Sequence, residues 1–537
     1  MRVTLVSTYN DRCYGLRMIA SYLRGQGHDV ALICFKRFMS RAIPPDETDT
    51  WRRVMAATYP PVVEPREEGD IPCPYLQEST PREWDLLLET IAAARPELVG
   101  ISTATATYDV ARALTERIHR ELPGVRVAWG GPHPMICPEE SIATADIVSI
   151  GEAEEAMAEL CADPRRTDIR GLWVRRNGEV VRNPLRPLEQ DLDKYPFASF
   201  GVNEFLIEDE RVYPCEASNK AYFREIYMIM TQRGCPFQCT YCIHNALRGL
   251  YKGERYFRRR SVDSVLAECA RRVKDFDLPG FAFFDDVFVI EPKWVAEFAA
   301  KYPRRIGVPF GGYAYPMVAT DEMFGQLRRA GMTFVALGVQ TGSDYVGREI
   351  YGRRYDSERI VELAWMAHRH GIEVNYEILS NCPYEREEDL RATLDLLTRM
   401  PKPLDFHVKK IVFFPRLKIN ALDKPRPNLP ETTFDFYNLL YLISRHHVLP
   451  REQLLALADD AYLKARPAVL RDVARALARA VQERDATCAA RDRAAAASPS
   501  ASWRGLLGYG KRLVMRALPA PVAESLRALK RRLARSG

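Results

Sequence analysis

The chain has 537 residues, a length at which we expect about three domains. Hydrophobic residues make up 47% of it and charged residues 28%, which is typical of globular proteins and excludes a disordered or collagen-like chain. It contains no run of about 18 apolar residues and no basic head before an apolar stretch. We therefore expect neither a spanning helix nor a secretory signal, and we predict a cytoplasmic protein.

The net charge of +6 is unevenly distributed. Residues 503–537 carry nine Lys or Arg and one Glu, a local +8, so the remainder is close to −2 (+6 − 8). A nearly neutral body argues against nucleic acid as a partner. The tail also contains Trp and Leu, so it is predicted either to contact a membrane surface peripherally or to form an ordinary packed or solvated helix pair.

Residues 1–190 alternate short apolar runs with amphipathic helical patterns, which predicts a doubly wound, Rossmann-like α/β domain. Asn177-Gly178 lies between two alternating runs and predicts a hairpin that closes this domain as a small ribbon. The predicted buried strands are residues 2–7, 28–35, 97–102, 125–130 and 146–150.

A second alternating series, in residues 215–420, predicts six strand–helix units and therefore an open, partial barrel. The pattern of residues 421–483 is helical, residues 484–503 are a low-complexity linker, and residues 504–537 form the basic amphipathic tail. The predicted barrel strands are residues 225–230, 280–286, 308–314, 334–340, 373–379 and 406–414.

One cysteine array carries most of the chemical information. Directly after the first predicted barrel strand, Cys235, Cys239 and Cys242 have C-x3-C-x2-C spacing. Three thiolates on one loop can hold three irons of a 4Fe–4S cluster and leave the fourth iron open to an outside ligand. Two alternatives remain: a zinc site completed by His244, or three unrelated buried thiols.

With Tyr241 directly before its third cysteine, the array resembles the signature of the radical S-adenosylmethionine (SAM) enzymes. The resemblance implies that SAM binds the open iron and that one electron, from a donor such as flavodoxin or ferredoxin, cleaves it to a 5′-deoxyadenosyl radical. It also implies a small-molecule substrate.

Two further segments extend this resemblance. Asp285 and Asp286, in the sequence FFDD, match the position where family members contact the methionine amino group; alternatively, one of them caps the next helix. The sequence GVQTGSD resembles the segment near the ribose, with Gln340 where the family usually has Glu. Its glycines, Gly338 and Gly342, can also simply shape a turn.

The front domain resembles the cobalamin-binding domain that precedes such barrels. The matching loops follow predicted strands, at the edge where open α/β sheets bind ligands. Their glycines would let a flat macrocycle lie against the backbone, and their hydroxyls would meet its amide arms; His133 is either such a contact or a structural residue. The predicted cobalamin-binding residues are Ser102, Thr103, Thr105, Gly130, Gly131, Pro132, His133, Gly151 and Glu152.

Many cobalamin domains carry Asp-x-His-x-x-Gly after the first strand, so that the His binds the lower face of cobalt. Here Asp11 is followed by Cys13 and Leu16 at the His and Gly positions, and His28 begins the second strand, at the other end of the sheet. We therefore predict that water, an uncharged side chain or nothing occupies the lower face; a ligand from the irregular segment 44–81 and a Cys13 thiolate are the alternatives.

Together these resemblances imply a cobalamin-dependent radical SAM enzyme. The favoured activity is a methyltransferase that passes a methyl group, via methylcobalamin, to an unactivated carbon or a phosphorus centre of a small molecule. One alternative uses the same cofactors for a non-methylating cyclisation or rearrangement. A more remote alternative is a cobalamin-binding sensor with a zinc-containing second domain.

Overall fold

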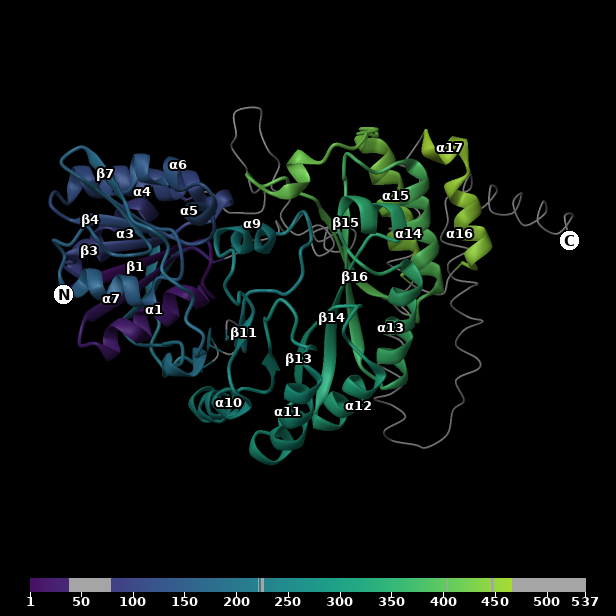
Figure 1. Cartoon of the computed structure of the whole chain (residues 1–537), viewed down its shortest axis with the longest axis horizontal. Helices are drawn as coiled ribbons and strands as arrows, with labels where there is room; N and C mark the ends of the chain where they lie inside the picture. The colour runs from purple at the N-terminus through teal and green to yellow at the C-terminus, as the bar shows by residue number, and fades with distance from the viewer. Residues whose placement is uncertain (38–78, 221, 224–226, 403, 446–448, 466–537) are drawn as a thin grey trace, which may run out of the picture. The chain divides into compact units, whose positions relative to one another are not determined.

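The computed structural model describes residues 1–37, 79–220, 222–223, 227–402, 404–445 and 449–465 (Figure 1). These residues form two compact units: the first holds the described residues up to 335 together with 412–422, and the second holds 336–411 and the described residues from 423 onward. The predicted linker, 484–503, and the basic tail, 504–537, lie outside the described residues.

The first unit contains a nine-stranded sheet of order β7-β6-β5-β4-β3-β1-β2-β8-β9. Its six central strands, from β5 to β8, are parallel, whereas β6, β7 and β9 are antiparallel to their neighbours. The strands are β1 (Arg2–Thr8), β2 (Asp29–Phe35), β3 (Leu98–Ser102), β4 (Arg126–Gly130), β5 (Ile147–Ser149), β6 (Leu172–Arg176), β7 (Glu179–Arg182), β8 (Glu204–Glu208) and β9 (Arg211–Pro214). The helices between them are α1 (Tyr14–Gly25), α3 (Pro81–Ala93), α4 (Tyr108–Glu121), α5 (Pro132–Ile136), α6 (Pro138–Thr144) and α7 (Glu154–Ala162).

The strand order predicts a ligand crevice beside β1. From β1 the chain continues to β2 on one side and then to β3 on the other, so the direction of winding reverses between β1 and β3. Open α/β sheets bind ligands at the carboxyl ends of the strands beside this reversal. The crevice therefore lies at the ends of β1 and β3, next to the loops predicted to bind cobalamin.

The front sheet differs from its prediction at both edges. The predicted hairpin forms as β6 and β7, with Asn177 at φ +52° and Gly178 at +83°, but β6 pairs with β5 and so extends the sheet instead of forming a separate ribbon. At the other edge, β8 pairs with β2 and β9 pairs with β8, although no strand was predicted there.

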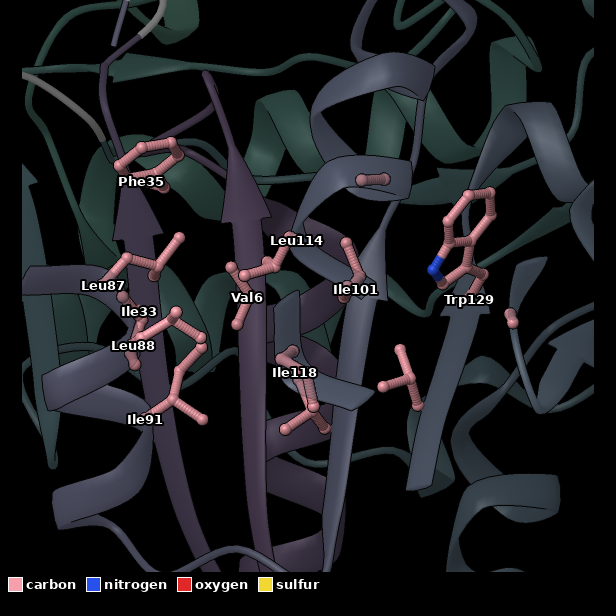
Figure 2. Packing of buried hydrophobic residues seen from close by; sticks show 14 of the residues in the cluster. Val6, Ile33, Phe35, Leu87, Leu88, Ile91, Ile101, Leu114, Ile118 and Trp129 are labelled. Atoms are coloured by element: carbon pink, nitrogen blue, oxygen red, sulfur yellow. The ribbon is translucent and has the colours of Figure 1, made fainter. Parts of the chain in front are cut away.

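A continuous apolar cluster holds the helices of one face onto this sheet (Figure 2). Leu87 and Ile91 of α3 lie over Ile33 of β2, and Leu114 of α4 lies between Val6 and Ile101. All six residues are at most 1% exposed. Burial of such a side chain contributes about 1.5–3 kcal/mol, so this face anchors the front sheet and fixes its strand ends. Helices α1 and α7 contact each other and contribute no residue to this cluster.

The rest of the first unit contains the first strand–helix repeats of the barrel. Within the predicted strand 225–230, the described residues 227–230 form no strand and make only an isolated parallel bridge, between Ile229 and Phe283. The side chains of Ser261 and Thr320 cap the N-termini of α10 and α12. The elements are β10 (Gln232–Arg233), α9 (Ile243–Leu250), β11 (Arg258–Arg259), α10 (Val262–Phe276), β12 (Phe281–Ala282), α11 (Pro292–Arg305), β13 (Phe310–Ala314) and α12 (Asp321–Ala330).

The second unit continues the alternation with three further strands. β14 (Met332–Gln340) begins in the first unit and ends in the second, and β15 pairs in parallel with β16. The remaining elements are α13 (Ser357–Arg369), β15 (Glu373–Ser380), α14 (Glu387–Arg399), β16 (Asp405–Lys410), α15 (Glu431–Ser444), α16 (Arg451–Ala458) and α17 (Ala461–Lys464). The predicted class is confirmed: an α/β front domain, a partial-barrel region of alternating strands and helices, and further helices after it. Within the described residues, no helix is long and apolar enough to cross a membrane.

Candidate functional site

The cysteine loop begins where β10 ends, and a glycine sets its path. Gly234 has φ +78°, and a Cβ on it would lie 2.3 Å from the backbone oxygen of Tyr256. Only glycine tolerates both the left-handed backbone and this close approach. The turn therefore directs the chain from β10 into the loop that carries the three cysteines.

The three cysteines lie on one loop before α9. Cys235 is buried, and burial raises the pKa of its thiol to about 12, so metal binding there must displace a proton. Cys239 and Cys242 are partly exposed, and the sulfur of Cys239 lies 3.8 Å from the Tyr315 hydroxyl. Tyr241, directly before the last cysteine, is partly exposed. Three thiols on an accessible loop suit a cluster with one open iron.

The zinc alternative does not fit this geometry. Both ring nitrogens of His244 are engaged, Nδ1 with the Tyr256 hydroxyl (2.8 Å) and Nε2 with Asp286 (2.9 Å). Thiolates around one zinc ion lie about 4 Å apart, given Zn–S bonds of about 2.3 Å. Among the described residues, however, only His133, Cys137 and Glu140 bring three potential ligand atoms within 4.8 Å of one another. The loop cysteines and His244 form no such group among the described residues, so this geometry does not favour the zinc alternative.

The two aspartates predicted to contact SAM have different environments. Asp285 is buried and accepts hydrogen bonds from the Thr231 amide (2.6 Å) and hydroxyl (2.6 Å) and from the Gln232 amide (3.1 Å). Burial raises its pKa to about 6. Asp285 thus ties the end of β12 to the residues before the cysteine loop, whereas the partly exposed Asp286 pairs with His244. Neither caps α11, whose N-cap is Glu291.

The cobalamin-type loops of the front sheet pack backbone against backbone. Gly131 has φ +101°, and a Cβ on it would lie 2.9 Å from the Thr103 oxygen and 3.3 Å from the Ser102 hydroxyl. The Thr103 amide donates to the Gly130 oxygen (2.8 Å), which joins the two loops. Gly131 therefore serves this close approach.

Orphaned polar atoms in this region fit an amide-rich ligand. Among the described residues, the buried Thr8 and Thr103 hydroxyls have no hydrogen-bond partner, whereas Nε2 of His133 lies 3.4 Å from a Glu140 oxygen. Nδ1 of His133 lies 3.3 Å from the Thr105 hydroxyl, and Pro132 begins α5. Buried polar atoms are nearly always paired, so the unpaired hydroxyls at the ends of β1 and β3 favour a bound ligand. Contact of these residues with cobalamin stays a prediction.

Glu152 and Gly151 have partners that the sequence did not reveal. Glu152 pairs with Arg258 (2.6 Å) and Arg233 (3.0 Å), and Glu154 pairs with Arg233 (2.5 Å). A Cβ on Gly151 would lie 2.4 Å from the Tyr251 hydroxyl. The two arginines carry no motif, and the only available signal was their position beside the cysteine loop.

One cavity of about 400 Å³ in the first unit joins the two sets of predicted residues. It opens onto loops at the carboxyl edge of the front sheet and onto residues around the cysteine loop. Three of the predicted cobalamin residues and Asp286 therefore face the same space, whereas the three cysteines are not part of its lining. Its lining from the front domain includes Tyr14, Gly15, Gly131, Met135, Gly151 and Glu152, and its lining from the barrel region includes Gln232, Arg233, Gly234, His244 and Asp286.

The predicted ribose segment lies in the second unit. Gln340 ends β14 with φ +67°, an unusual backbone for a residue with a side chain. A Cβ on Gly342 would lie 2.6 Å from Thr393, and the Gly342 amide donates to the Thr393 hydroxyl (2.8 Å). Gly342 is therefore required for packing against α14, and the role of Gln340 toward SAM stays a prediction.

Comparison with protein families supports the class that this site defines. Residues 229–397 match the radical SAM superfamily, and residues 75–161 match the B12 binding domain. The chain is a cobalamin-dependent radical SAM enzyme of the methyltransferase type. The predicted cofactors, a 4Fe–4S cluster, SAM and cobalamin, are confirmed at the level of this class.

Two curated relatives and one solved structure illustrate the likeness. The chain is 25% identical to the uncharacterized methyltransferase PH0819 of Pyrococcus horikoshii, over 67% of this chain and 77% of that protein. It is 26% identical to the anaerobic magnesium-protoporphyrin IX monomethyl ester cyclase of Rubrivivax gelatinosus, over 49% of this chain and 48% of the cyclase. The structure of the cobalamin-dependent SAM radical enzyme OxsB, bound to aqua-cobalamin and SAM, matches with a TM-score of 0.57 and 15% identity, covering 99% of this chain and 81% of OxsB. At that identity the structural match supports the fold alone.

Proposed function

We propose that this enzyme transfers a methyl group from cobalamin to an unactivated carbon, or to a phosphorus centre, of a small molecule. Bound cobalamin supplies a methyl carrier, and the cluster with SAM supplies a radical that abstracts hydrogen. The observation that carries the proposal is the shared cavity, because methyl transfer needs one substrate to reach both cofactors.

In this proposal, the chain's own residues hold and orient the cofactors. Cys235, Cys239 and Cys242 bind three irons, and Asp285 fixes the backbone that leads into their loop. The orphaned hydroxyls of Thr8 and Thr103 meet cobalamin amides at the carboxyl edge of the front sheet. An external one-electron donor of the flavodoxin or ferredoxin type reduces the cluster.

The second candidate is a radical cyclisation with the same cofactors, favoured by the similarity to the Rubrivivax cyclase. The two are separated by SAM labelled with deuterium in its methyl group, supplied to anaerobic protein that carries reduced cobalamin. A methyltransferase moves the label to cobalamin even without substrate. Cobalamin that stays unlabelled while 5′-deoxyadenosine forms would favour the cyclisation.

We also propose, from sequence alone, that the tail 504–537 contacts an anionic membrane surface. Its nine cations, each contributing about 1 kcal/mol near such a surface, accompany Trp503 and several leucines. Flotation with liposomes rich in phosphatidylserine tests this proposal. The full chain should float, whereas a chain of residues 1–500 should not; equal flotation of both would contradict the proposal.

A further inference from the structure

Two arginines lie side by side at the base of the cysteine loop. Arg233 ends β10 two residues before Cys235, and the antiparallel register of β10 and β11 places Arg258 opposite it. Like charges directly opposite on paired strands repel each other. This ribbon therefore needs carboxylates from another part of the chain.

The carboxylates come from the front domain, directly after β5. Arg258 donates through both terminal nitrogens to Glu152 (2.6 and 3.1 Å), while Arg233 donates to Glu152 (3.0 Å) and Glu154 (2.5 Å). The Arg258 side chain is 2% exposed and that of Glu154 is 6% exposed. We name these four residues the Arg–Glu cluster; its formal charges cancel. Bidentate arginine–carboxylate pairs in a poorly hydrated site fix both the distance and the orientation between the two groups.

A second contact lies beside the Arg–Glu cluster. Gly151 precedes Glu152, and the hydroxyl of Tyr251, the residue after α9, occupies the space that a Cβ on Gly151 would need. Because α9 directly follows Cys242, this contact links the same front loop to the other end of the cysteine loop. The front loop thus touches the chain on both sides of the three cysteines.

We propose that Arg233 is a positioning residue that fixes the cysteine loop, and with it the cluster, at a set distance from cobalamin. This inference rests on the proposed function, since it needs both cofactors bound. A misplacement of about 1 Å between reacting groups lowers rates by about 100-fold, so two loops that carry separate cofactors require such a fixed spacing. Glu152 then acts through Arg233 and Arg258, besides any contact with cobalamin.

The test measures the distance between the reduced cluster and cob(II)alamin by pulsed electron paramagnetic resonance, which needs no substrate. In the wild type we expect one narrow distance distribution. In Arg233→Ala the distribution should shift or broaden by about 1 Å or more. Arg416→Ala is the matched control, because Arg416 pairs with Glu139 of the front domain at 2.9 Å, yet both side chains are more than half exposed.

Iron and cobalamin contents separate failure of this inference from failure of the proposed function. A wild type that does not bind both cofactors would contradict the proposed function. If Arg233→Ala binds both and keeps the wild-type distribution, the positioning role is wrong. If Arg233→Ala loses the cluster, the distance is measured in Glu154→Gln instead, because this variant removes one partner of Arg233 that lies outside the cysteine loop. A broader distance distribution in Glu154→Gln supports the positioning role of Arg233, and an unchanged distribution overturns it.

Discussion

The cysteine loop and the front-sheet loop at Gly151–Glu154 encode their roles in different ways. On the cysteine loop, the sequence motif consists of the side chains that are expected to bind the cluster. Cys235, Cys239 and Cys242 lie on one loop, as their spacing predicts. On the second, Gly151 and Glu152 suggested a ligand site, but the structure pairs Glu152 with arginines of the barrel region and sets Gly151 against Tyr251.

This contrast shows which residue types can be interpreted from sequence. A thiolate triad at fixed spacing has few uses besides binding a metal. A glycine or a carboxylate has many, since glycine serves any close approach and a carboxylate pairs with any nearby cation. Substitutions can test whether the cysteine loop and the front-sheet loops also act independently in function.

Replacement of one cluster ligand should have the largest effect. In Cys239→Ala the cluster loses an iron ligand, so we expect reductive SAM cleavage to fall by at least about 1,000-fold, a change of about 4 kcal/mol in the barrier. Cobalamin binding should stay at the wild-type level. Iron analysis and chromatography of 5′-deoxyadenosine measure the first effect, and cobalamin absorbance the second; a variant with full iron and undiminished cleavage would contradict the assignment.

The loop after β15, in the second unit, contains a buried carboxyl group, that of Glu385. Burial raises the pKa of Glu385 from an ordinary 4.5 to about 8, so the fold favours its neutral form. Its stabilising contribution is complete below pH 4.5 and is lost as the pH rises through 8. The difference between the free energies of unfolding at pH 6 and pH 9 should therefore be about 3 kcal/mol larger in the wild type than in Glu385→Gln. Denaturant titrations at both pH values measure this, and parallel pH profiles would contradict it.

On the front sheet, Gly131→Ala tests whether the close approach of the Gly131 backbone to Thr103 is needed for cobalamin binding. The new Cβ would lie 2.9 Å from the Thr103 oxygen at a φ of +101°, so the loop must shift. We expect cobalamin affinity to fall by about tenfold, for a strain of about 1–3 kcal/mol, with the iron content unchanged. Gly25→Ala is the control, since its Cβ meets nothing within 4 Å. Equal cobalamin titrations for both variants would remove Gly131 from the site.

The smallest predicted signal concerns the lower face of cobalt. The structure confirms that His28 is at the wrong end of the sheet, since its ring lies 3.4 Å from the N-terminal amine. Cys13, at the position of the usual His, has its sulfur 3.9 Å from that of Cys34. We expect the paramagnetic resonance spectrum of cob(II)alamin to lack nitrogen splitting. Splitting from an axial nitrogen would prove this prediction wrong.

The sequence predicted the elements that local pattern determines. The five strands β1 to β5 of the front sheet form where the apolar runs predict them. Two features depend on distant residues and were not predicted: β8 and β9 join the sheet only through β2, and the Arg–Glu cluster joins residues about 80 to 106 positions apart. The segment 225–230 looked like a strand because it is apolar, but its described residues form one bridge.

The proposed enzyme uses SAM in two ways, as a methyl donor and as a source of the radical, and analysis of the SAM products tests this most directly. Anaerobically reconstituted protein, given SAM, cobalamin and a strong reductant, should release both S-adenosylhomocysteine and 5′-deoxyadenosine, identified by mass spectrometry. Omitting cobalamin should abolish only the first product, and Cys239→Ala should abolish only the second. Protein that carries both cofactors but forms only one of the two products under every condition would contradict the account.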